Sequence, residues 1–245
     1  MSVVESASPK AVLLIPAAGS GRRMGGSVSK QYLQLAGRPL LAHTLALFDS
    51  HPLVEAIYPI VPAEDHDYCR EEIVSKYRFT KVKRLIAGGA QRQDSVRNGF
   101  LALAGDGYDQ PRRPVLIHDG ARPLFDPRLL PELLHQVDRQ GACIVAVPVK
   151  DTIKQVAAGR IIASPERESL WQAQTPQGFQ YHVLEQAFSR AGDGPLPATD
   201  DAALVAAAGF SVAVVPGDDR NLKITTPADL VIAAALLDSC REESA

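Results

Sequence analysis

The sequence has little cysteine. Its three cysteines, Cys69, Cys143 and Cys240, lie far apart among 245 residues and form no CxxC pair. This scarcity and spacing argue against a disulfide framework and against a structural zinc site, and they are typical of a protein from a reducing compartment. We therefore expect a cytoplasmic protein.

The sequence also lacks long apolar runs and an excess of either charge. No stretch approaches the roughly 20 apolar residues of a membrane-spanning helix, and the first residues, MSVVESASPK, do not have the pattern of a signal peptide. The 26 basic and 28 acidic residues leave a net charge of −2. We therefore expect neither membrane nor nucleic acid as a partner, and any anion site must be local.

Apolar, strand-like segments alternate with segments of helical period. The expected strands are 11–16, 56–61, 82–87, 114–119, 142–148 and 211–216. The expected helices are 40–50, 65–76, 91–104, 127–139, 181–191, 199–208 and 226–239. Several strands are apolar throughout, which indicates burial on both faces in a mainly parallel sheet. The pattern predicts one layered α/β domain over residues 1–245, with ligands beyond the C-terminal ends of the strands.

Residues 152–166 break this alternation. The stretch TIKQVAAGRIIASPE has the pattern of two short strands around a turn at Gly159, with no helix between them. Its apolar side chains need a cover, and they are Ile153, Val156, Ile161 and Ile162. Two alternatives follow from the residues alone: the hairpin is a dimer arm, or it folds back on its own domain.

A glycine-rich segment, PAAGSGRRMGGSVSKQ (16–31), follows the first expected strand. Gly19 and Gly21 permit a close approach of the backbone to a ligand, and successive backbone N–H groups can line an anion-binding concavity. The segment matches neither the Walker motif nor the dinucleotide fingerprint. With Arg23 and Lys30 it is either a phosphate-binding loop or a surface turn with solvated arginines.

Two other motifs follow expected strands. IHDGARP (117–123) places Asp119 at a strand end, where a carboxylate can hold Mg²⁺ or a ribose hydroxyl, or can pair with Arg122. GGAQRQDSVRNG (88–99) enters a helix and can contact a ligand through backbone groups, or can be an ordinary capped helix start. His118 is expected to be a satisfied strand-end histidine rather than a base.

These motifs occur in one order with KQYL, PLLAHTL, DTIK, LWQAQTPQGF, TDDA and NLKITTP, from about residue 11 to residue 230. The ordered set strongly resembles the 2-C-methyl-D-erythritol 4-phosphate cytidylyltransferases of the non-mevalonate isoprenoid pathway. The resemblance implies a Rossmann-like nucleotidyltransferase fold, with a mainly parallel mixed sheet flanked by helices. It also implies a projecting β-hairpin arm, about residues 149–169, that exchanges contacts in a homodimer.

The resemblance further implies the reaction and a map of the site. CMP passes from CTP to 2-C-methyl-D-erythritol 4-phosphate, with Mg²⁺ or another divalent cation, and pyrophosphate is released. The cytosine is expected against Ala17, Ala18, Gly89 and Ser95, and the ribose against Pro16, Gly19, Asp119 and Gly120. The triphosphate is expected on the loop with Gly21, Arg23 and Lys30. The methylerythritol phosphate is expected on Arg122, Thr152, Arg167, Thr175, Thr199 and Lys223.

Within this map, Arg23, Lys30 and Lys223 are the expected catalytic residues. Asp119 is the expected metal residue, although the CTP phosphates would hold most of the Mg²⁺ coordination. Thr152 and Arg167 lie in or beside the arm, so the resemblance implies that they serve the partner subunit's site.

The proposed chemistry needs no general base. A phosphate monoester has a second pKa of about 6 and is already a nucleophilic dianion at neutral pH. Positioning and charge compensation then carry the catalysis. Two alternatives remain: a cytidylyltransferase acting on ribitol 5-phosphate, and a non-catalytic nucleotide-binding module on the same fold.

Overall fold

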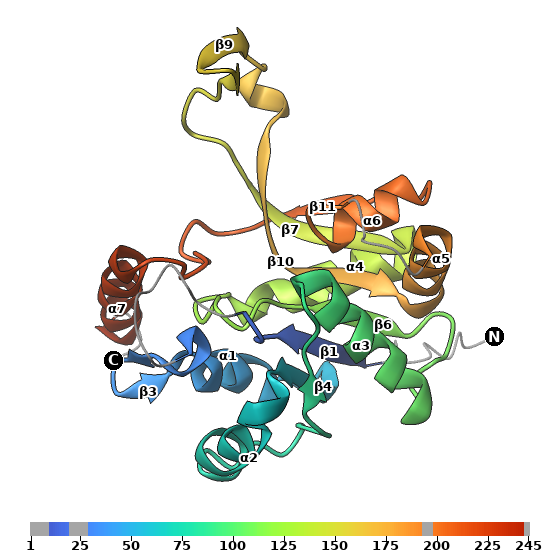
Figure 1. The fold of residues 1–245 in the computed structure, drawn as a ribbon, viewed down its shortest axis with the longest axis vertical. Coiled ribbons are helices and arrows are strands. Elements are labelled where there is room, and N and C mark those ends of the chain that lie inside the picture. Colours follow the sequence, from blue (N-terminus) through green and yellow to red (C-terminus); the bar gives the residue numbers. More distant parts are fainter. Residues whose placement is uncertain (1–9, 20–28, 193–197, 243–245) are drawn as a thin grey trace, which may run out of the picture.

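A central sheet covered by helices organises the chain (Figure 1). The structure, a computed structural model, describes residues 10–19, 29–192 and 198–242. In spatial order the strands of the sheet are β11 (Ala213–Pro216), β7 (Ala142–Pro148), β10 (Trp171–Gln180), β6 (Pro114–Ile117), β1 (Ala11–Pro16), β4 (Val54–Val61) and β5 (Ile86–Ala87). Strand β10 runs antiparallel to both its neighbours, whereas the other pairs in the described sheet are parallel. The expected mainly parallel mixed sheet is confirmed.

Helices pack on both faces of this sheet. One face carries α3 (Arg92–Gly105), α5 (Tyr181–Ala191) and α6 (Asp201–Ala207), and the other carries α1 (Leu40–Asp49) and α4 (Leu130–Gln140). In β1, Val12 and Leu14 pack toward the first face, while Leu13 and Ile15 pack toward the second. Because side chains alternate along a strand, burial on both faces requires the uninterrupted apolar run of β1.

A smaller layer closes one end of the molecule. Helix α7 (Pro227–Glu242) packs against the short hairpin of β2 (Gln34–Leu35) and β3 (Arg38–Pro39). Their contact is a separate apolar cluster, formed by Leu35, Leu40, Ile224 and Ala233. This packing places the segment before α7 beside the C-terminal ends of the central strands.

Some predicted boundaries were wrong. The expected strand 82–87 is reduced to β5 and an isolated bridge between Val82 and Ile57. The expected helix 65–76 is a 3-10 turn (Ala63–Asp65), a single α turn, α2 (His66–Tyr68), and a π-helical segment (Cys69–Ser75). Helix α6 begins at Asp201 rather than at residue 199, because the Asp200 side chain caps it.

Strand β10 was missed altogether. Its sequence, WQAQTPQGFQ, is polar and contains Pro176, and both features argue against a central strand. Its buried glutamines are nevertheless satisfied: Gln177 bonds to the start of α6, Gln174 to the Asp218 carbonyl, and Gln180 to the end of α4. A register irregularity between Ala173 and Gln177 accommodates the proline. These partners are distant in sequence, so no local pattern predicts the strand.

The hairpin arm leaves the body between β7 and β10 (Figure 1). It consists of β8 (Gln155–Ala157) and β9 (Arg160–Ala163), joined through Ala158 and Gly159, which both have positive φ. Two such residues suit the twist of a two-residue hairpin turn. Residues 151–169 are all exposed, which excludes the alternative that the hairpin folds back on its own domain.

Candidate active site

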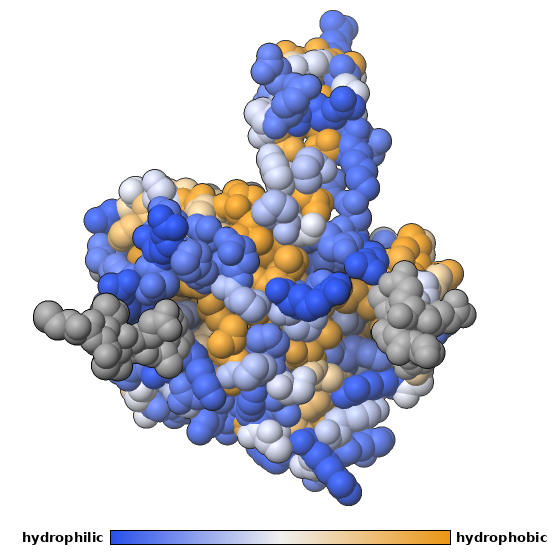
Figure 2. All heavy atoms as spheres, turned by 180° about the vertical axis from the view of Figure 1, so that it is seen from behind, coloured by the Kyte–Doolittle hydropathy of each residue, from blue (hydrophilic) through white to orange (hydrophobic). Residues whose placement is uncertain are grey.

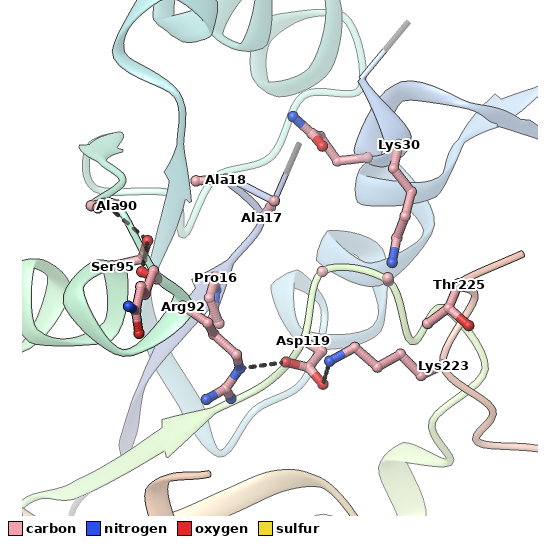
Figure 3. Close-up of a pocket in the computed structure, with 16 residues that line it drawn as sticks. Pro16, Ala17, Ala18, Lys30, Ala90, Arg92, Ser95, Asp119, Lys223 and Thr225 are labelled. Carbon is pink, nitrogen blue, oxygen red and sulfur yellow. Dashed lines mark hydrogen bonds and ion pairs between the residues drawn. The ribbon is translucent and has the colours of Figure 1, made fainter. Parts of the chain in front are cut away.

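A pocket of about 550 Å³ lies beyond the C-terminal ends of β1 and β6 (Figure 3). Its lining includes ten of the predicted site residues: Pro16, Ala17, Ala18, Gly19, Lys30, Gly89, Ser95, Asp119, Gly120 and Lys223. They come from five separate segments of the chain, which only the sheet topology brings together. The predicted Gly21 and Arg23 lie outside the described residues.

Small residues let the strand ends approach one another at the pocket wall. A Cβ on Gly120 would lie 2.9 Å from the Cβ of Ala17, and a Cβ on Gly88 would lie 2.2 Å from that of Ala18. Side chains at these glycines would therefore force the loops apart. The wall beside β1 is built largely from backbone, which suits recognition of a flat ligand by N–H and C=O groups.

Ser95 fixes the loop that precedes α3. Its buried hydroxyl accepts a hydrogen bond from Gly89 N (3.0 Å) and donates one to the Gln91 carbonyl (3.1 Å). Asp94 accepts from Gln91 N at 2.9 Å and completes a capping box. The helix start is thus capped, and the same loop lines the pocket, so the cap is confirmed and ligand contact stays a prediction.

Asp119 is surrounded by three cations. Its Oδ1 lies 3.0 Å from Arg92 Nε, and its Oδ2 lies 2.9 Å from Lys223 Nζ and 3.5 Å from Arg122 Nε. Burial raises the pKa of this carboxyl, but Arg92 and Lys223 outweigh burial and hold the pKa well below its usual range. Asp119 is therefore ionised at neutral pH, and it both pairs with Arg122 and lines the pocket.

His118 is buried behind Asp119 and has both ring nitrogens engaged. Nε2 lies 3.0 Å from the Arg122 carbonyl, which can only accept, so Nε2 carries the proton. Nδ1 then accepts from the Thr175 hydroxyl at 3.1 Å. Burial lowers the pKa of His118 to about 4. The expectation of a satisfied strand-end histidine is confirmed.

The residues predicted for the second substrate lie in three places. Arg122 and Lys223 line a second pocket of about 260 Å³, where Arg122 also donates to the Asn221 carbonyl at 2.6 Å. Thr175 is buried, and its hydroxyl accepts from Asp119 N at 3.0 Å, so it contacts Asp119 rather than either pocket. Thr199, Thr152 and Arg167 are exposed and line neither pocket, the last two from the arm.

Sequence reasoning missed Arg92 and Asp201. Arg92 lines the pocket, with Nη2 2.9 Å from Asp201 Oδ2. A signal was available, because Arg92 is the first residue of α3, where the helix dipole disfavours a cation. An arginine at that position indicates nearby carboxylates, but it does not say which ones.

Comparisons with known proteins agree with this arrangement. The family model described as IspD, 2-C-methyl-D-erythritol 4-phosphate cytidylyltransferase, matches residues 11–239. A relative of that name from Syntrophotalea carbinolica is 52% identical, over 93% of this chain and 96% of the relative. Another, from Geotalea uraniireducens, is 47% identical over 94% of this chain and 97% of the relative.

Solved structures agree in fold. The 2-C-methyl-D-erythritol 4-phosphate cytidylyltransferase from Thermus thermophilus aligns with a TM-score of 0.74 at 34% identity, over 93% of this chain and 98% of that one. The 4-diphosphocytidyl-2C-methyl-D-erythritol synthase from Anaerococcus prevotii aligns with a TM-score of 0.79 at 28% identity, over 94% and 97%.

Proposed function

Because the chain belongs to the 2-C-methyl-D-erythritol 4-phosphate cytidylyltransferase family, we propose that it transfers CMP from CTP to 2-C-methyl-D-erythritol 4-phosphate, with release of pyrophosphate. The protein is thus a nucleotidyltransferase. The observation that carries its mechanism is the convergence of ten predicted site residues on one pocket. Ribitol 5-phosphate as the substrate and a non-catalytic role are not favoured, since the relatives are named for the methylerythritol reaction.

The nucleophile is the substrate phosphate itself. As a dianion it attacks the α-phosphorus of CTP, and the bond to the β-phosphate oxygen breaks to release pyrophosphate. No residue has to remove a proton, which agrees with the engaged, neutral imidazole of His118. Among the described residues, the pocket is lined by neither histidine nor cysteine.

Cations from separate elements compensate the negative charge of the phosphates. Lys30 extends into the pocket from a 3-10 turn (Lys30–Tyr32), and Lys223 extends into it from the segment before α7 (Figure 3). Because Lys223 also lines the smaller pocket, it can contact phosphates of both substrates. We assign Lys30 and Lys223 to the charge that develops on the reacting phosphates, with Arg23 as the third such cation.

The residues fit a magnesium ion held mainly by the nucleotide. Mg²⁺ prefers oxygen ligands and usually binds through one or two carboxylates plus substrate phosphates. Asp119 is the one carboxylate among the described lining residues, and the described residues contain no cluster of three or more potential metal ligands. When bound, the ion would neutralise phosphate charge. Asp119 would contact either this ion or the ribose of CTP.

The arm is proposed to complete the site of a second copy of this chain. Ile153, Val156, Ile161, Ile162 and Trp171 are between 40% and 63% exposed. Hydrophobic residues, coloured orange, are visible along the arm in Figure 2. A projecting apolar hairpin is stabilised when another surface covers it, and a two-fold dimer covers both arms at once. Thr152 and Arg167 would then reach the partner's pocket.

The cysteines are the observation that bears on the location of the protein. In the parts of the chain that the structure describes, no helix is long and apolar enough to cross a membrane. The scarce cysteines, two of them buried and free, suit a reducing compartment. We assign the protein to the cytoplasm.

Pyrophosphate release tests the function directly. The assay contains CTP and Mg²⁺ and compares 2-C-methyl-D-erythritol 4-phosphate with ribitol 5-phosphate. We expect release with the first substrate alone. Preference for ribitol 5-phosphate would contradict the substrate assignment, and CTP binding without turnover on either substrate would contradict the enzymatic role.

A further inference from the structure

Arg92 joins a carboxylate inside the pocket to one outside it. Its Nε lies 3.0 Å from Oδ1 of Asp119, which lines the pocket (Figure 3). Its Nη2 lies 2.9 Å from Oδ2 of Asp201, which is 3% exposed and lines neither pocket. One guanidinium therefore forms ion pairs with two carboxylates, Asp119 on the substrate side and Asp201 inside the protein.

Asp201 is itself held in place by the sheet. It is the first residue of α6, whose N-cap is Asp200. Gln177 of β10 donates to Asp200 Oδ2 at 2.8 Å and accepts from Ala202 N at 2.9 Å. The buried side chain of Gln177 thus fixes the start of α6 on the central sheet, and with it the direction in which Asp201 holds Arg92.

A second contact ties the same two helix starts together. Gln93, next to Arg92 in α3, donates to the Ala198 carbonyl. Ala198 precedes Thr199, the residue assigned to the methylerythritol phosphate. Helix α3 also carries Ser95, beside the expected cytosine position. The nucleotide side and the polyol-phosphate side of the site are therefore joined through Arg92 and Gln93.

We propose that Arg92 is a positioning residue: with Asp201 behind it, Arg92 fixes Asp119 in the pocket. This inference rests on the proposed cytidylyltransferase function. Arg92 acts through Asp119 and does not itself contact the reacting atoms. With Oδ1 held by Arg92, Asp119 presents Oδ2 to Lys223 at 2.9 Å.

The geometry of the guanidinium explains why an arginine is needed. Its donors lie in one rigid plane, so carboxylates bound by Nε and Nη2 are fixed relative to each other. A lysine ammonium carries the same charge without that constraint. Fold stability alone does not account for the arrangement, because buried ion pairs are often no more stabilising than apolar residues of similar volume.

A kinetic double-mutant cycle tests the inference. Arg92→Gln is made in the wild-type chain and in an Asp119→Asn background, and kcat/KM for 2-C-methyl-D-erythritol 4-phosphate is measured at saturating CTP. We expect a loss of about 30-fold in the wild-type chain, since small misplacements of reacting groups are costly. In the Asp119→Asn background we expect a loss below about threefold, because coupled residues are non-additive. Equal losses in both backgrounds would show that Arg92 acts independently of Asp119 and would overturn the proposal.

Two further variants separate position from charge and from folding. Asp201→Asn keeps the shape of the side chain and should lower kcat/KM about tenfold, but only where Arg92 is present. Arg92→Lys keeps the charge and should stay at least about tenfold below wild type, because one ammonium cannot hold both carboxylates. Wild-type rates in either variant would contradict the positioning role. If Arg92→Gln does not fold, Asp201→Asn carries the test.

The matched control lies at the other end of the same helix. Arg84 Nε pairs with Asp106 Oδ2 at 3.0 Å, next to the C-terminal end of α3. Arg84→Gln should leave kcat/KM within about twofold of wild type, as expected for an exposed pair. An inactive wild-type protein would contradict the proposed function. An active wild type with unaffected variants would contradict only the role of Arg92.

Discussion

Removing the Lys223 ammonium should slow the chemical step more than it weakens the fold. The ammonium lies 2.9 Å from Asp119 Oδ2, and the side chain is 39% exposed. A unit charge about 4 Å from a phosphate oxygen contributes about 4 kcal/mol at an effective dielectric constant of about 20. Solvent screening at this exposure reduces that to about 3 kcal/mol, which corresponds to a loss of about 10²-fold in kcat.

The fold should tolerate Lys223→Ala because Asp119 keeps its other cations. Arg92 remains 3.0 Å and Arg122 3.5 Å from the carboxylate, so Asp119 stays ionised and paired. We therefore expect a melting temperature close to that of the wild type, together with the loss in kcat.

The assay is pyrophosphate release at saturating concentrations of both substrates, with thermal unfolding measured on the same samples. The control is Lys76→Ala, which removes an exposed ammonium that pairs with Glu72 and lines neither pocket. The control should keep the wild-type rate. Turnover of Lys223→Ala within a few-fold of wild type would remove Lys223 from the mechanism and refute the electrostatic reasoning.

Three further predictions follow from the site and the arm. Burial lowers the pKa of His118 from its ordinary value to about 4. As the pH drops, the unfolded chain therefore protonates His118 before the folded chain does. The free energy of unfolding should fall between about pH 6.5 and about pH 4, by about 3 kcal/mol in total. Urea unfolding should show this difference between the wild type and His118→Gln, and a variant with the same pH dependence as the wild type would contradict it. Chelation of the divalent cation by EDTA should abolish pyrophosphate release and excess Mg²⁺ should restore it; full activity in EDTA would disprove the metal requirement. Mixing inactive Arg167→Ala and Lys223→Ala subunits should restore up to about a quarter of the wild-type activity. Half of the dimers are then mixed, and each mixed dimer has one intact site out of two. If the subunits exchange between dimers and no activity returns, the shared site is contradicted.

The extent to which the sequence predicted the fold differs between β1 and β10. Strand β1 is buried on both faces, so its apolar run is a local signal that needs no knowledge of its neighbours. Strand β10 is buried through glutamine side chains whose partners lie 23 to 47 residues away in the chain. Hydrogen bonds to residues distant in the chain satisfy these buried glutamines, and such bonds produce no hydrophobic periodicity in the sequence.

The same distinction applies to the site. Gly19, Gly89, Gly120 and Asp119 stand in short motifs at strand ends, and the resemblance of the ordered motifs to a known family placed them in one site, where they line one pocket. Arg92 and Asp201 lie in motifs that had also been recognised, yet their ion pair joins the starts of two helices that are separated by five strands in the chain. A motif predicts which residues face a ligand more readily than it predicts which other residues fix the positions of those ligand-facing side chains.

The local charge explains how a chain with a net charge of −2 can bring two anions together. Asp119 and Asp201 face Arg92, Arg122 and Lys223 within direct contact distance, so cations outnumber carboxylates in this group before Lys30 is counted. Since four of these five groups are largely buried, their arrangement is fixed before substrate binds. A preorganised cationic pocket stabilises phosphate charge without reorganising during the reaction, and this is the term that dominates phosphoryl-group transfer. Asp119 has a structural role as well, because its carboxylate lies between Arg92, Arg122 and Lys223 and offsets the repulsion among these three cations.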